Sequence, residues 1–506
     1  MTGRRRGAFA AARKAAGHTQ ESLAEALHID RATVNRWEAG RHAPLPYVRP
    51  KLARLLGRSL HQLDTLLGPA DTPVDGQVSA ETVEIDVDID LACEWLDVHT
   101  GWRPGASRSQ VIAGLTATKA GSLRDRDRRR GKVTRTNIAH AISNYYRETM
   151  RGHGVYRAHY DGFDVQTTVL SRPNWLDLAC LLTPDTDRLA LAGASAGQDI
   201  NLDDVAAKHA IRRLLEAAVL RVRMTNAPLY RLLNVNVDTQ AILGELDIIP
   251  FVQYALTTDL VERELVDALA DGTAELPLRE KYLRDVGTVL DVTERFCCGG
   301  VLALCAIARP ADPYRGPADY LLLVQERADH VLNSVGRLSV IPKGFHQPLT
   351  DFRSGAFVGA TLRRELEEEL FGRRDVDGTL SEHRVADPMH PNRLSEPMRW
   401  LQNEDGMRLE CTGFGFNLVN GNYEFAGLVV IDDDDFWRRY GDRIEANWES
   451  AGLRQYSSLD RRFITELIAD ESWSNEGLFA FLQGLRRLSQ IDETRVRAPD
   501  IEWELA

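Results

Sequence analysis

A short stretch that follows the first 68 residues indicates that this chain folds as more than one domain. Residues 69–82, PADTPVDGQVSAET, are rich in Pro, Gly, Asp, Ser and Thr and show no hydrophobic periodicity, which is typical of a linker. A chain of 506 residues is also too long for one ordinary domain, so we expect between two and four. We predict a head over residues 1–68, a linker over 69–84 and a larger body.

Charge is divided unevenly between the head and the rest of the chain. Residues 1–68 contain 12 Lys and Arg and 5 Asp and Glu, a net of +7. The remaining residues contain 50 basic and 69 acidic side chains, a net of −19. A basic head on an acidic body favours a head that meets a polyanion, although a basic segment can also be merely solubilising.

Composition argues against several classes of protein. With 43% hydrophobic and 27% charged residues the chain is typical of a soluble globular protein. It contains no long uncharged apolar run, and Arg13 and Lys14 interrupt the N-terminal apolar segment, so we expect no membrane span, no signal peptide and a cytoplasmic protein. The six cysteines lack paired Cys-x-x-Cys spacing, which favours reduced buried thiols over zinc or disulfides.

The head has the pattern of short helices joined by tight turns. TQESLAEAL predicts a helix capped by Thr19, and RATVNRWEAG predicts a second helix that ends at Gly40. Two helices joined by a short turn, with a polar and basic outer side on the second, form the helix-turn-helix arrangement. A small helical interaction module without a DNA role is the alternative.

These residues resemble the Cro/C1-type (XRE) helix-turn-helix family. The resemblance rests on Thr19-Gln20, Leu23-Ala24, Ile29, ATVNRWEAG and LARLLGRSLHQLD, about 60 residues in all. It implies double-stranded DNA as the partner and operator binding by a homodimer. Gln20 is then expected at the phosphate backbone and Val34 and Trp37 in the core. The expected groove-facing residues are Arg31, Ala32 and Asn35, with Arg36 near phosphate.

Residues 85–290 give weaker signals. Amphipathic helical segments alternate with strand-like segments such as FDVQTTVL, which predicts a mixed α/β or α+β domain of unknown role. The arginine-rich run RDRDRRRGKVTR, residues 124–135, is interpreted as a solvated loop rather than a nucleic-acid contact.

The segment GATLRRELEEEL, residues 359–370, places four glutamates within five positions of a predicted helix. Its leucines repeat every four residues and indicate a packed face. At 100° per residue, Glu365, Glu368 and Glu369 fall on one side of the helix and Glu367 on the other. Like charges at these spacings oppose helix formation, whereas converging carboxylates suit Mg²⁺ or Mn²⁺. A solvated glutamate face is the ordinary alternative.

The elements around this helix, in their order, resemble the Nudix fold over residues 291–506. Strands GGVLALCAIA and YLLLVQER and the segment IPKGF come before the helix, and a hairpin through Asn420-Gly421 follows it. RELEEE matches the core of the family motif. The resemblance implies an α/β/α domain, Glu365, Glu368 and Glu369 as metal ligands, and Arg364 as the anchor of the helix to the preceding loop.

The sequence departs from that family in the loop before the helix. Thr350 and Ala356 stand where the family spacing places a Gly and a Glu, and Lys343 replaces a Gly. Lys343 offers a point charge for a ligand phosphate, beside Arg364. Glu367 and Glu424 are the candidates for a general base, and Glu368 is the expected catalytic ligand of an active enzyme.

Two functions follow from these resemblances. In the first, the chain is a sequence-specific transcription regulator whose Nudix-like domain senses a nucleotide-type small molecule, such as a nucleoside diphosphate derivative. In the second, it is an active metal-dependent pyrophosphohydrolase that carries a DNA-binding head. The altered loop favours the first, because sensing needs a grip on phosphate and no activated water.

Overall fold

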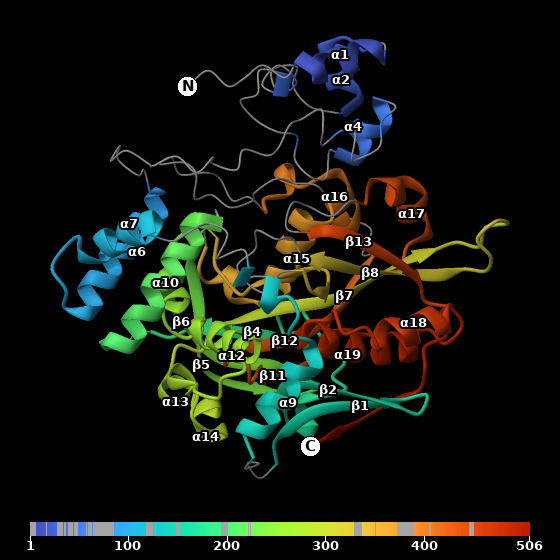
Figure 1. Cartoon of the computed structure of the whole chain (residues 1–506). Coiled ribbons are helices and arrows are strands. Elements are labelled where there is room, and N and C mark those ends of the chain that lie inside the picture. Colours follow the sequence, from blue (N-terminus) through green and yellow to red (C-terminus); the bar gives the residue numbers. More distant parts are fainter. Residues whose placement is uncertain are drawn as a thin grey trace. The chain divides into compact units, whose positions relative to one another are not determined.

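The computed structural model separates a small N-terminal unit, Met1–Val83, from a large unit, Glu84–Ala506 (Figure 1). The predicted linker at 69–84 lies outside the described residues. The structure describes residues 7–16, 18–27, 34, 37–38, 44, 49–56, 58, 63, 85–117, 125–126, 128–147, 152–193, 201–220, 222, 224–327, 336–349, 351–371, 389–403, 406–444 and 450–506.

Short helices form the described part of the small unit. They are α1 (Gly7–Ala15), α2 (Gln20–Leu27) and α4 (Arg49–Leu55). Thr19 caps α2 as predicted, because its Oγ1 accepts a hydrogen bond from the Ser22 backbone N–H at 2.9 Å. Val34 and Trp37 are buried in one apolar cluster with side chains of all three helices, as the resemblance implied.

One mixed sheet organises the large unit. Its main path runs β13-β8-β7-β12-β11-β2-β1-β14, and the short strands β10, β3 and β9 pair with β7, β11 and β8. Only the β7–β12 pair is parallel among the described pairs of this sheet. The strands are β1 (Gly154–Tyr160), β2 (Phe163–Ser171), β3 (Cys180–Leu181), β7 (Gly299–Arg309), β8 (Asp319–Arg327), β9 (Leu338–Val340), β10 (Lys343–Phe345), β11 (Met407–Asn417), β12 (Tyr423–Ile431), β13 (Ser450–Ser457) and β14 (Ile501–Leu505).

A second, smaller sheet and the helices complete this unit. The sheet has the order β4-β6-β5 and is built from β4 (Asp187–Leu191), β5 (Pro228–Val237) and β6 (Ile242–Pro250). The helices are α6 (Val87–Thr100), α7 (Ala106–Ala117), α9 (Arg135–Tyr145), α10 (Asp204–Leu220), α11 (Phe251–Ala255), α12 (Leu260–Asp271), α13 (Pro277–Tyr282), α14 (Val286–Leu290), α15 (Val358–Glu369), α16 (Glu396–Asn403), α17 (Asp434–Tyr440), α18 (Arg461–Ile468) and α19 (Asn475–Ile491).

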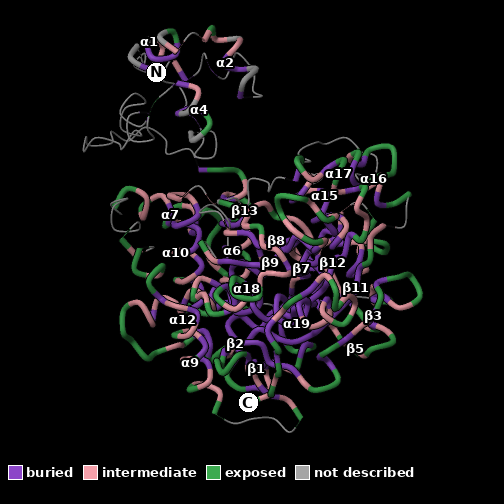
Figure 2. Tube along the Cα trace, turned by 90° about the vertical axis from the view of Figure 1, so that its right-hand side faces the viewer, coloured by how far each residue is buried: buried purple, intermediate pink, exposed green. Residues whose placement is uncertain are grey.

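The central strand β7 is buried on both faces because its side chains alternate between two cores. Val301, Ala303 and Cys305 pack in the cluster that contains the apolar stripe of α15, whereas Leu302 and Leu304 pack in the cluster that contains α19. A continuous apolar run such as GGVLALCAIA is what a strand covered on both sides requires. Figure 2 shows β7, β8 and β12 as largely buried tube in the middle of the body.

Residues 85–290, which we expected to form a domain of their own, share their sheet with residues 291–506. β2 pairs with β11 through Leu170 and Phe416, and β1 pairs with β14 at the end of the chain. The larger unit therefore begins at Glu84 and shows no division near residue 290. The isolated sequence could not reveal these pairings, because they join segments separated by hundreds of residues.

Two local predictions have different outcomes. The hairpin between β11 and β12 turns through Asn420-Gly421 as predicted, with Gly421 at a φ of 78° that favours glycine. In the arginine-rich run at 124–135, interpreted as a solvated loop, Arg128 is exposed to solvent as expected, whereas Arg130 forms ion pairs with the helices that follow. Arg130 bridges Glu216 and Asp267 at 3.2 and 2.6 Å with 12% of its side chain exposed.

Within the part of the chain that the structure describes, no helix is both long and apolar enough to cross a membrane.

Trp37→Ala should remove the central aromatic side chain of the small unit and destabilise that unit by about 3–5 kcal/mol, because the cavity cannot fully collapse. Hydrogen exchange of the full chain, followed separately for residues 7–63 and 85–506, measures the effect. Protection should fall in the first segment and stay unchanged in the second. An equal fall in both would contradict two separately folded units.

Candidate functional site

The head has an internal polar contact that engages Gln20, one of its predicted DNA-binding residues. Gln20 begins α2, and its Nε2 donates to Glu38 Oε2 at 2.5 Å. Arg13 Nε of α1 donates to the other Glu38 oxygen at 2.7 Å. Glu38 thus joins the first two helices, and the Gln20 side chain, expected at the phosphate backbone, is engaged within the head. Arg31, Ala32, Asn35 and Arg36 lie outside the described residues, so their roles stay predictions.

In the body, α15 is fixed against the sheet by apolar and polar contacts. Leu362 and Leu366 are fully buried in the apolar cluster that covers one face of β7. Arg364 donates from Nη1 to the Gln347 carbonyl at 2.8 Å and from Nη2 to the Phe345 carbonyl at 3.1 Å. The guanidinium therefore attaches the helix to β10 and the loop that follows it, as the sequence resemblance implied. This contact occupies donors that we had also considered for a ligand phosphate.

The three candidate metal ligands have different surroundings. Glu365 is 6% exposed, and its Oε1 accepts from Arg364 Nη2 at 2.5 Å. A Cβ on Gly344 would lie 2.1 Å from the Glu365 carboxyl carbon, so only glycine permits this approach. Glu369 is 1% exposed and accepts from the Lys343 backbone N–H at 2.8 Å. Glu368 is half-buried.

These contacts affect whether the three glutamates are available to bind the predicted Mg²⁺ or Mn²⁺. Among the residues that the structure describes, no three His, Cys, Asp or Glu side chains are grouped as a metal site. Two of the three carboxylates, Glu365 and Glu369, already accept hydrogen bonds from protein donors. The arrangement as it stands does not fit a bound cation, and metal binding by Glu365, Glu368 and Glu369 stays a prediction.

Glu367, one of the two candidate bases, has a structural contact. It is fully buried and accepts from the Ser395 backbone N–H at 2.6 Å and from Ser395 Oγ at 2.5 Å. Ser395 directly precedes α16, so Glu367 ties the start of that helix to α15. Its contact with the start of α16 lies on the side of α15 away from Glu365 and Glu369, as the helical periodicity predicted, and its role as a general base stays a prediction.

A second polar group lies where β10, β12 and the start of α19 meet. Lys343 Nζ donates to Glu476 Oε1 at 2.7 Å, with only 16% and 10% of the two side chains exposed. Burial alone would raise the pKa of Glu476, but the Lys343 ammonium outweighs it and holds the pKa at about 2. In this structure the Lys343 charge, predicted to meet a phosphate, is therefore paired with a carboxylate of the protein.

Two neighbouring carboxyl groups, those of Glu424 and Glu262, have pKa values raised above the usual range. Burial raises the pKa of Glu424 to about 8, and the Glu476 carboxylate adds to the rise. Burial also raises the pKa of Glu262 to about 7, with Asp259 and Glu476 adding to it. Glu424 accepts no hydrogen bond from any side chain or backbone donor in the described residues. A buried carboxyl with a pKa near neutrality and no donor can bind or exchange a proton with a ligand.

The asparagines of the hairpin, which we considered as readers of a base or sugar, are held by the protein. Asn417 Oδ1 accepts from Thr168 Oγ1 at 2.8 Å, and Asn422 Nδ2 donates to the Tyr254 hydroxyl at 2.9 Å. Asn420 Oδ1 accepts from the Asn422 backbone N–H at 3.0 Å, which makes it a turn residue. Their amides shape the hairpin and leave Glu424 as the available polar group of this segment.

Sequence reasoning missed Glu262 and Glu476, which complete this group with Lys343 and Glu424. Glu476 is the second residue of α19 and Glu262 lies in the first turn of α12. Acidic residues are common at helix N-termini because of the helix dipole, so neither stands out in the sequence. Only the folding of α12 and α19 onto the end of β12 brings them together.

The comparison with protein families concerns the head. Residues 9–63 match the family model described as Helix-turn-helix. The matched segment contains α2, Val34, Trp37 and α4, the elements of the apolar cluster described above. No curated protein matches this chain.

The raised pKa of Glu424 predicts a pH-dependent stability. The pKa of Glu424 is 4.5 in the unfolded chain and about 8 in the folded chain. Between these values the folded state binds more protons than the unfolded state, so the free energy of unfolding falls as the pH rises through this range. Glu424→Gln is neutral at every pH and should reduce the loss, measured by urea denaturation between pH 5 and 8. Glu466→Gln, an exposed carboxyl, is the control; identical slopes for all three proteins would contradict the assignment.

Proposed function

We propose that this DNA-binding regulator, whose head is a helix-turn-helix domain of the XRE family, senses a nucleotide-type small molecule through a Nudix-like body. The match of residues 9–63 to the helix-turn-helix family carries the DNA-binding part. In such proteins phosphate contacts supply most of the affinity and base contacts supply the specificity. The head binds its operator as a homodimer, with Arg31, Ala32 and Asn35 facing the groove.

Several features of the body support the ligand-sensing part of this proposal. The RELEEE segment lies on a helix beside a mixed sheet, and α15 and α19 cover opposite faces of β7. Lys343 is a partly buried lysine paired with Glu476, whereas Glu424 is a buried carboxyl on an apolar strand, where a polar group without a partner is costly. A phosphate that takes the place of the Glu476 carboxylate beside Lys343, or a ligand that donates to Glu424, would be held by these two groups.

Sensing by linkage requires only that the ligand bind two arrangements of the body unequally. The partners of α15 suit this role. Arg364 and Glu369 connect the helix to β10, the strand that carries Lys343. A ligand that moves Lys343 would therefore act on the attachment of α15 as well as on the start of α19.

A metal-dependent hydrolase is the second candidate, and Glu424 is the observation that favours it. Its pKa of about 8 lies near that of a general base, whose efficiency is greatest near the working pH. Hydrolysis would also require Glu365 and Glu369 to give up their protein donors in favour of Mg²⁺ or Mn²⁺. The pairing of both carboxylates makes sensing the better-supported function.

DNA recognition is tested on the head. Arg31→Ala and Asn35→Ala should each abolish preference for the selected operator and leave weak binding to any duplex, because base contacts supply specificity and phosphate contacts remain. Fluorescence anisotropy with operator and scrambled duplexes at one salt concentration measures this. Arg58→Ala, a described arginine near the end of the head, is the matched control. An equal loss on both duplexes would exclude the two residues as base readers.

Ligand binding and turnover are tested on the body. A panel of nucleoside diphosphate compounds, with and without Mg²⁺, should include at least one that raises the melting temperature of the full chain without being consumed. Lys343→Ala should remove that stabilisation because it removes the ammonium, whereas Glu466→Gln should retain it. Turnover of a compound by the wild type that is lost in Glu368→Gln would contradict the sensing function and favour the hydrolase.

A further inference from the structure

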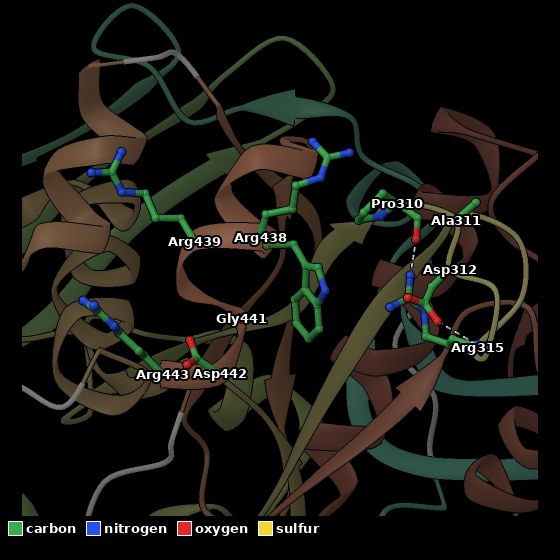
Figure 3. A pocket seen from close by; sticks show the side chains of 10 residues that line it. Pro310, Ala311, Asp312, Arg315, Arg438, Arg439, Gly441, Asp442 and Arg443 are labelled. Atoms are coloured by element: carbon green, nitrogen blue, oxygen red, sulfur yellow. Dashed lines mark hydrogen bonds between the residues drawn. The ribbon is translucent and has the colours of Figure 1, made fainter.

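A hollow lined by four arginines and by Asp312 and Asp442 is built from other elements than the group around Lys343 and Glu424. It has a volume of about 650 Å³ and is formed by the loop after β7 and by α17 with the short helix η5 (Gly441–Arg443). In Figure 3 the loop residues Pro310, Asp312 and Arg315 lie on one side of it, and the arginines of α17 and η5 lie on the other. A volume of this size is sufficient for a small ligand.

The loop side is held in a fixed shape. The Asp312 carboxylate accepts from the backbone N–H groups of Tyr314 and Arg315 at 2.9 and 3.1 Å, which fixes the turn and lowers the pKa of Asp312, so it stays ionised. Asp312 and Gly316 exchange two backbone hydrogen bonds that close the loop. The Arg315 guanidinium donates to the Pro310 carbonyl, which keeps it at the rim of the hollow.

Trp437 lines the hollow, and its ring is approached by Gly441 and by Arg309. A Cβ on Gly441 would lie 2.7 Å from the ring, and the Arg309 guanidinium stands 5.5 Å from its centroid on the sheet side. Arg309 is neutralised by a buried pair with Asp319 at 2.9 Å. The other residues around the hollow are mostly polar or charged, and their side chains decide what it can bind.

Those walls contain three exposed arginines that form ion pairs at the surface. The side chains of Arg438, Arg439 and Arg443 are 59%, 56% and 60% exposed. Arg438 pairs with Asp435, whereas Arg439 and Arg443 share one carboxylate, Glu396, at 3.9 and 3.3 Å. Exposed ion pairs contribute little and are easily exchanged, so these guanidinium groups can turn to a bound anion.

We infer that this hollow binds a phosphate-bearing anion through Arg315, Arg438 and Arg443. Guanidinium groups present paired N–H donors that match the oxygens of a phosphate, and a charge-assisted bidentate contact is stronger than an ordinary hydrogen bond. The site is distinct from the centre around Lys343 and Glu424, and it is an arginine cluster in a part of the chain whose net charge is −19. Its phosphate can come from a free phosphoanion or from the backbone of duplex DNA.

The two sources are separated by experiments on the full chain. In the first, inorganic pyrophosphate is titrated and the melting temperature of the body is followed, with sodium chloride at matched ionic strength as the reference. We expect saturable stabilisation in the wild type, its loss in the double variant Arg438→Ala/Arg443→Ala, and its retention in Arg462→Ala. Arg462 is a suitable control because its side chain is 85% exposed and forms one ion pair, with Glu466.

In the second experiment, binding to a scrambled duplex is measured over a range of salt concentrations. If the hollow binds DNA phosphate, the double variant should reduce the slope of log K against log salt by about 0.9 for each phosphate that is no longer neutralised. Loss of pyrophosphate stabilisation alone assigns the site to a free phosphoanion, and a reduced slope assigns it to DNA. If neither changes, or if Arg462→Ala has the same effect, the inference is wrong. Should the double variant fail to fold, Arg438→Lys keeps the charge and tests the bidentate contact alone.

Discussion

The burial of β7 on both faces is the constraint on which the rest of the body depends. Its alternate side chains belong to two apolar clusters, one with Leu362 and Leu366 of α15 and one with Leu478 and Leu482 of α19. Each helix is therefore held to the same strand from an opposite side. The polar groups on the two helices, Glu369 of α15 and Glu476 of α19, then reach β10 at the edge of this assembly, where both contact Lys343.

This arrangement puts groups with opposite electrostatic tendencies close together at a largely buried site. Lys343 keeps Glu476 ionised, whereas Glu424 and Glu262 have pKa values raised toward neutrality by burial. Interactions between charges are strong where water is excluded, so a ligand that adds or removes one charge changes the balance of all four groups. That sensitivity is the physical ground for the proposed sensing role.

The sequence was most informative where a pattern is local. The periodicity of α15, the cap at Thr19, the hairpin turn at Gly421 and the burial of Val34 and Trp37 all depend on residues close together in the chain, and the structure agrees with them. The pairing of residues 85–290 with the C-terminal sheet could not be predicted, because strand partners far apart in sequence leave no periodic signal.

The same limit applies to the candidate site. Helical periodicity placed Glu365, Glu368 and Glu369 on one side of a helix, yet it could not show that Arg364 and the Lys343 backbone would engage two of them. It also gave no indication of Glu262 and Glu476, which lie on α12 and α19, two helices that are far from α15 in the sequence. Side chains that meet through tertiary packing are visible only in the folded chain.

If the body senses a ligand on behalf of the head, operator affinity depends on whether the body is occupied. An operator is first selected from a random duplex library with the full chain, and its dissociation constant is then measured with and without a saturating nucleoside diphosphate compound that binds the body. The account predicts a ligand-dependent change in operator affinity of about 5- to 150-fold, the usual range of allosteric coupling. An operator affinity that stays the same when the body is saturated would contradict it.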